Sequence, residues 1–127
     1  MQDSHLFEYA VIRVVPRVER EEFINVGVIL YCARTKFLRA EFIFNEPRLA
    51  SFSSRLDTAE IACHFDAMMR ICSGSKEGGF IASLDLASRF RWLTATRSTV
   101  VQTSKVHPGF CKDPQEMLDR LVLEQVF

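Results

Sequence analysis

The stretch that decides the fold is "FINVGVILYC", residues 23–32, an apolar segment that contains one amide and one glycine. Alternation along it predicts a β-strand, because successive side chains of a strand point to opposite faces. One predicted face is wholly apolar and comprises Ile24, Val26, Val28, Leu30 and Cys32. The other face comprises Phe23, Asn25, Gly27, Ile29 and Tyr31. The two residues that break the apolar pattern, Asn25 and Gly27, are therefore predicted to share a face.

Three further strands are predicted around this one, at residues 7–15, 38–44 and 98–104. Short polar connections between the first three strands favour an antiparallel meander. Placing apolar faces together puts Arg13 opposite Asn25 and Val11 opposite Gly27. On the other side of the central strand, the same rule predicts the pairs Leu30–Ala40, Val28–Phe42 and Val26–Phe44.

Two helices are predicted at residues 58–72 and 114–126. Asp57 is typical of a helix N-cap, and Asp113 followed by Pro114 repeats the signal. The predicted buried stripes are Ile61, Ala62, Phe65, Met68, Met69 and Cys72 in the first helix, and Met117, Leu118, Leu121, Val122 and Gln125 or Val126 in the second. Residues 82–95 form a weaker helical pattern, residues 73–79 a loop, and His107-Pro108-Gly109 a turn.

The predicted sheet has one apolar face and one mixed face, which carries Arg13, Asn25, Arg39 and Glu41. We expect the helix at 58–72 to cover the apolar face. The C-terminal helix either covers more of that face or packs beside it, and whether it covers the mixed face is left open. The fold class is α+β, with two or three layers in a single domain over residues 1–127.

Composition restricts the function classes. Lys plus Arg and Asp plus Glu number 16 each, so the net charge is zero, which argues against a dedicated polyanion binder. The four cysteines form no C-x-x-C pair, and we expect free thiols in a reducing cytoplasm. We expect no signal peptide, no membrane span, no metal site and no cofactor, because the sequence carries no motif for any of them.

Asn25 and Gly27 have two interpretations. In the structural one, Gly27 marks a bulge or accommodates a neighbouring aromatic ring, and Asn25 only satisfies a polar contact. In the functional one, the hairpin before residue 23 forms a binding site with aromatic and arginine anchors, as protein interfaces do. The candidate binding residues are Tyr9, Arg13, Arg17, Glu19, Arg20, Glu22 and Asn25.

A second candidate site lies in "RFRWLTATR", residues 89–97. Arg89, Arg91 and Trp92 combine basic and aromatic side chains, a pattern typical of single-stranded nucleic-acid contact. On a helix, however, the arginines are equally explained as a solvated face. Nucleic acid is therefore not the expected partner.

Much of the chain resembles a bacterial family known as domain of unknown function 3037. The resemblance rests on Tyr9, Arg13, Pro16, Arg17, Glu19, Arg20, Glu22, Phe23, Asn25, Val26 and Gly27, and on the later Asp113-Pro114 and Leu118-Asp119-Arg120-Leu121. It implies a small intracellular bacterial protein without an assigned activity. It also implies a partner, since members are often encoded beside a kinase-like protein of the HipA type.

Three functional hypotheses follow. The leading one is a non-enzymatic binding, adaptor or regulatory module that acts with another protein. The second is an enzyme acting on a phosphate-containing substrate, with Arg13 and Arg17 on the anion and Glu19 or Glu22 as base. The third is nucleic-acid binding through Arg89, Arg91 and Trp92.

Overall fold

The computed structural model describes residues 4–16, 22–53, 56–95, 97 and 99–127. Its elements are β1 (His5–Val14), β2 (Ile24–Cys32), β3 (Phe37–Phe42), α1 (Glu46–Phe52), α2 (Thr58–Ser73), a 3-10 turn (Lys76–Gly78), α3 (Gly79–Ala82), α4 (Leu86–Leu93), β4 (Val101–Thr103), β5 (His107–Cys111) and α5 (Pro114–Gln125). The α+β class is confirmed. Within the described residues, no helix is long and apolar enough to cross a membrane.

The strands form one antiparallel sheet in the order β3-β2-β1-β4, with β5 also paired to β1. The predicted meander of the first three strands is confirmed. One edge of β1 pairs with β2, so β4 and β5 share the opposite edge: β5 pairs with residues 5–9 and β4 with residues 12–14. Ser104 lies where the pairing passes from β4 to β5, and its buried hydroxyl accepts a hydrogen bond from the Val11 amide at 2.9 Å.

The register departs from the prediction on both sides of β2. Arg13 does pair with Asn25, but Val11 pairs with Val28, because a bulge shifts the register between Ile12 and Arg13. Between β2 and β3 the observed pairs are Gly27–Phe42, Val28–Glu41 and Leu30–Arg39, one residue away from the predicted register. The prediction matched apolar faces under strict alternation, and a bulge breaks that alternation.

The bulge also changes which face each β2 residue occupies. Val26 and Ile29 pack in one core cluster, whereas Val28 and Leu30 pack in the other. The apolar face predicted from Ile24 to Cys32 is therefore divided between the two sides of the sheet. Asn25 shares the side of Val28 and Leu30, because its amide bonds to the helix that covers them.

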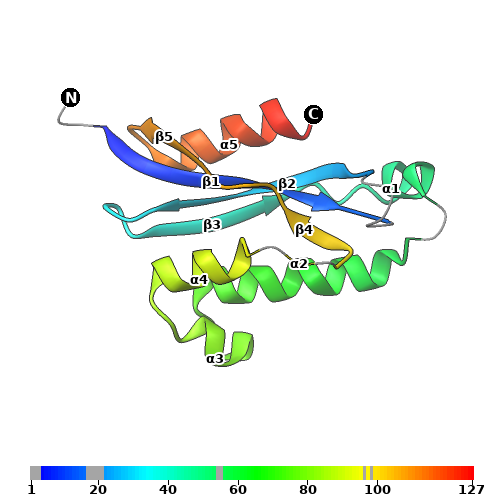
Figure 1. The fold of residues 1–127 in the computed structure, drawn as a ribbon, viewed down its shortest axis with the longest axis horizontal. Coiled ribbons are helices and arrows are strands. Elements are labelled where there is room, and N and C mark those ends of the chain that lie inside the picture. The colour runs from blue at the N-terminus through cyan, green and yellow to red at the C-terminus, as the bar shows by residue number, and fades with distance from the viewer. Residues whose placement is uncertain (1–3, 17–21, 54–55, 96, 98) are drawn as a thin grey trace.

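Helices cover both faces of the sheet, which makes three layers (Figure 1). On one side, α2 and α4 pack against Ala10, Ile12, Val14, Val26, Ile29 and Ala40. On the other side, Leu118, Leu121 and Val122 of α5 pack against Val28 and Leu30. The mixed face is thus the one that α5 covers: Gln115 accepts from Arg39 at 2.6 Å and donates to Glu41 at 2.9 Å.

Both predicted helix starts are confirmed. The Asp57 carboxylate accepts from the amides of Ala59 and Glu60, and Asp113 accepts from the amides of Gln115 and Glu116. The predicted end of α2 is also confirmed, since Gly74 adopts a left-handed conformation with φ 73°. Met69 was wrongly placed in the buried stripe: it is 46% exposed, and Ile71 occupies the core instead.

Two local predictions were wrong, and two were only partly correct. His107-Pro108-Gly109 belongs to β5 rather than to a turn, and Pro108 is tolerated there because β5 is an edge strand. Residues 73–79 contain a 3-10 turn and the first residue of α3. The helix expected at 82–95 is present in shorter form as α4, whereas Ala82 ends the separate helix α3. The helix α1 was not predicted at all. β4 is shorter than the predicted 98–104.

Candidate functional site

The first candidate site is the corner where the loop end of the β1–β2 hairpin meets the end of α5. We call it the hairpin corner and define it by Arg13, Phe23 and Asn25. The Arg13 guanidinium lies over the Phe23 ring, 4.0 Å from its centroid. Phe23 is 45% exposed. A cation stacked on an exposed ring presents a flat surface that is charged along one side and apolar along the other.

The hairpin corner is attached to α5 by hydrogen bonds to the last carbonyls of the helix. Asn25 Nδ2 of the corner donates to the Gln125 carbonyl at 3.0 Å, and Arg48 of α1 donates to the neighbouring Val126 carbonyl at 3.2 Å. These carbonyls have no partner within a helix, and a cation there also favours the helix dipole. The corner is therefore built from strand and helix. Phe127, which is 74% exposed, follows Val126 in the chain.

Two buried polar atoms of the hairpin corner lack a hydrogen-bond partner in the described structure, namely Arg13 Nε and Asn25 Oδ1. One is a donor and the other an acceptor, on residues directly opposite in the register. No carboxylate of the described residues pairs with Arg13. The positive charge of the corner is therefore not neutralised by a described carboxylate.

The structure brings together only part of the predicted binding set. Arg13 and Asn25 are neighbours, and Glu22 is exposed at the start of the same strand region. Tyr9 lies farther along β1, opposite His107 of β5, with ring centroids 5.4 Å apart. Arg17, Glu19 and Arg20 lie outside the described residues, so their part in the site, as base or anion ligand, stays a prediction.

The three residues of the nucleic-acid hypothesis have separate roles in the described structure. Arg89 donates to the carbonyls of Ile71 and Cys72 at 3.0 and 3.1 Å, so it caps the end of α2. Arg91 and Trp92 are exposed on α4. Nucleic-acid contact by Arg91 and Trp92 is untested, whereas Arg89 has a structural function that its sequence context did not reveal.

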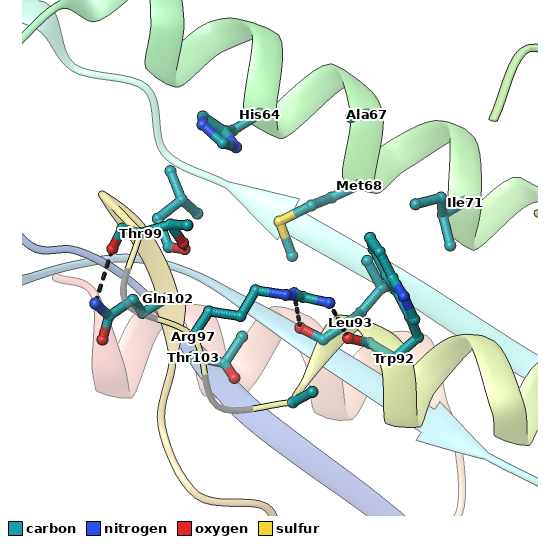
Figure 2. A pocket seen from close by; sticks show the side chains of 12 residues that line it. His64, Ala67, Met68, Ile71, Trp92, Leu93, Arg97, Thr99, Gln102 and Thr103 are labelled. Carbon is teal, nitrogen blue, oxygen red and sulfur yellow. Dashed lines mark hydrogen bonds between the residues drawn. The ribbon is translucent and has the colours of Figure 1, made fainter. Parts of the chain in front are cut away.

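A second hollow, which we call the α2–β4 pocket, lies on the opposite side of the sheet from α5 (Figure 2). Its volume is about 180 Å³. Met68, Ile71, Leu93 and Val101 give it an apolar floor, and its rim carries His64, Trp92, Arg97, Thr99, Gln102 and Thr103. Sequence analysis missed this pocket, because α2, α4 and β4 meet only in the folded chain.

The family model described as "Protein of unknown function (DUF3037)" matches residues 9–126, nearly the whole chain. The protein belongs to the DUF3037 family. The match confirms the resemblance drawn from the hairpin and from the start of α5. No curated protein and no solved structure matches the chain.

The buried thiols of this DUF3037 protein are poor candidates for nucleophiles. Burial raises the pKa of Cys72 to about 12, so the thiolate is not formed near neutral pH. Burial, followed by the neighbouring Cys32, also raises the pKa of Cys111. Among the residues described, no group of three or more His, Cys, Asp or Glu side chains could hold a metal ion.

Proposed function

We propose that this DUF3037 protein is a non-enzymatic binding module that docks onto another protein through the hairpin corner. The observation that carries the proposal is the Arg13–Phe23 stack, in which a half-buried arginine without a described carboxylate partner lies over an exposed ring. Arginine and aromatic side chains are the commonest anchors of protein interfaces.

Two exposed apolar residues lie at the end of α5 and just after it. Leu123 is in the last turn of the helix and Phe127 follows the helix, and they are 64% and 74% exposed. Asn25 joins this end of α5 to the stack. The partner surface that suits the corner is an apolar patch bordered by a carboxylate, which would pair with Arg13.

The proposed partner is a kinase-like protein of the HipA type, in the cytoplasm of a bacterium, as the family resemblance implies. A regulatory or adaptor function follows if the corner binds such a protein, since the module then alters or localises an activity that its partner supplies.

Affinity purification of tagged protein from its own host tests the proposal with two matched phenylalanine variants. Phe23→Ala removes the ring of the stack, and Phe80→Ala removes a 77% exposed ring on α3. We expect wild type and Phe80→Ala to retain the same stoichiometric partner, and Phe23→Ala to lose most of it. Retention by Phe23→Ala combined with loss by Phe80→Ala would place the docking surface elsewhere.

A further inference from the structure

The α2–β4 pocket is independent of the hairpin corner, so a ligand of the pocket need not affect docking at the corner. The pocket lies on the α2 side of the sheet, whereas the corner lies on the α5 side. Its volume of about 180 Å³ suits a body about the size of one ring, because an apolar cavity of about 150 Å³ holds benzene.

Arg97 brings a positive charge to the rim of this pocket. Its guanidinium lies 4.1 Å from the centroid of the Trp92 ring and donates to the carbonyls of Trp92 and Leu93 (Figure 2). These two bonds use two of the five N–H groups of the guanidinium. Burial lowers the pKa of Arg97, and no carboxylate of the described chain pairs with it.

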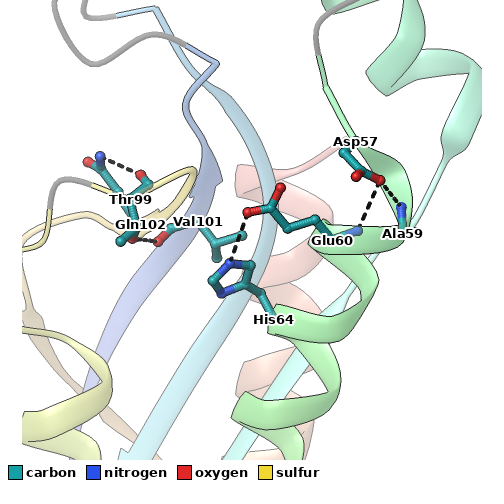
Figure 3. Close-up of polar contacts among 7 residues, drawn as sticks. All are labelled: Asp57, Ala59, Glu60, His64, Thr99, Val101 and Gln102. Carbon is teal, nitrogen blue, oxygen red and sulfur yellow. Dashed lines mark hydrogen bonds and ion pairs between the residues drawn. The ribbon is translucent and has the colours of Figure 1, made fainter.

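The other polar side chains of the rim are already engaged with the protein. Gln102 donates to the Thr99 carbonyl at 2.7 Å, and Thr99 donates to the Val101 carbonyl at 2.8 Å (Figure 3). Thr103 donates to the Thr94 carbonyl at 3.3 Å. Arg97 is therefore the rim group with most donors to spare.

His64 stands at the opposite side of the pocket, beside an acidic side chain. Its Nε2 lies 4.0 Å from the carboxylate of Glu60, one turn earlier on α2 (Figure 3). The pocket thus offers one unmatched cation beside an apolar floor. A dianion such as a phosphate monoester would leave a charge unpaired in this setting, whereas a monoanion would not.

We propose that the α2–β4 pocket binds a small monocarboxylate, with an apolar body on Met68, Ile71 and Leu93 and its carboxylate on Arg97. Burial of the apolar body contributes to the binding free energy through the hydrophobic effect, and the apolar floor is already formed in the structure. The carboxylate contributes charge-assisted hydrogen bonds from the free N–H groups of Arg97 and removes the cost of an unmatched cation.

Phenylacetate and its uncharged amide, phenylacetamide, are the probes that test this proposal. Trp92 is the single tryptophan of the chain and lines the pocket, so its indole N–H signal in an NMR spectrum reports occupancy. We expect the wild-type protein to bind phenylacetate about tenfold more tightly than phenylacetamide, since a hydrogen bond to a charged group is lost with the amide.

Three variants separate ligand binding from protein stability. Arg97→Gln should abolish the preference for the acid. Arg91→Gln, which changes an exposed arginine on α4, should keep that preference. Arg97→Gln also removes contacts to the end of α4, so it can unfold the pocket. Ala67→Phe keeps Arg97 but fills the pocket with a larger side chain, so it should weaken the binding of both phenylacetate and phenylacetamide.

An indole signal that does not move at millimolar phenylacetate would contradict the proposal, as would equal affinities for phenylacetate and phenylacetamide. A preference for the acid that survives in folded Arg97→Gln would show that Arg97 serves only to cap α4.

Discussion

Gly27 and Asn25 interrupt the apolar pattern of β2 for two different physical reasons. A Cβ at Gly27 would lie 2.3 Å from the carbonyl oxygen of Glu41, so the close approach of β3 requires a glycine. Asn25 is required for its amide, which bonds to α5. The structural interpretation therefore accounts for the glycine: the backbone of Glu41 is the nearest obstacle to a Cβ, the ring of Phe42 follows at 3.1 Å, and the bulge adjoins Gly27.

Replacing Gly27 with alanine tests the close approach. We expect Gly27→Ala to lower the free energy of unfolding by at least about 2 kcal/mol, because β3 must move away from β2. Gly79→Ala is a comparison in which a Cβ meets nothing within 4 Å and only the backbone conformation, φ 74° and ψ −158°, is unfavourable. That backbone strain costs about 1–3 kcal/mol. Denaturant unfolding measures the stability of both variants, and an unchanged free energy of unfolding in Gly27→Ala would contradict the close approach of β3.

At the scale of single elements, the sequence predicted the segments whose signals are local. Asp57 and Gly74 define α2, and Asp113 with Pro114 defines the start of α5, since caps depend on residues a few positions apart. The register of β2 and the strand β5 were not predicted correctly. Both depend on residues distant in the sequence: the backbone carbonyl of Glu41 lies close to Gly27, and the ring of Phe7 lies against Gly109.

The connection between β2 and α5 gives a second prediction. Asn25→Ala removes the hydrogen bond to the Gln125 carbonyl and should cost about 1 kcal/mol. We expect faster amide hydrogen exchange in the last turn of α5 only. Arg39→Ala is the control, because it removes a contact with Gln115 at the other end of the helix. Uniformly faster amide hydrogen exchange along the whole of α5 in both variants would contradict a local attachment of the helix end to Asn25.

At the scale of the whole molecule, α5 forms a third layer of the fold. The sequence left open whether the last helix covers the mixed face, because Arg39 and Glu41 resemble solvated residues. Gln115 resolves this by bonding to both of them, so α5 covers the mixed face although Arg39 stays exposed. The candidate site is only half predicted for the same reason: Arg13 and Asn25 adjoin in the register, but their contact with the end of α5 is tertiary.

Two leucines of α5 test the third layer. Leu118 is fully buried and Leu123 is 64% exposed, although both lie in the same helix. We expect Leu118→Ala to cost about 2–5 kcal/mol, because it leaves a cavity between α5 and the sheet. Leu123→Ala should stay within about 0.5 kcal/mol of wild type. Urea unfolding measures the free energy of unfolding of both variants. Similarly small losses of stability in the two would contradict tight packing of α5 against the sheet.

The central claim is that the hairpin corner docks onto another protein, and one affinity measurement tests it most directly. Isothermal calorimetry compares the purified partner's binding to wild type, to Arg13→Gln and to Arg34→Gln, an exposed arginine between β2 and β3. Because Arg13 lacks a described carboxylate partner, we expect Arg13→Gln to weaken binding by at least about tenfold. We expect Arg34→Gln to leave it unchanged. Wild-type affinity in folded Arg13→Gln would contradict the claim.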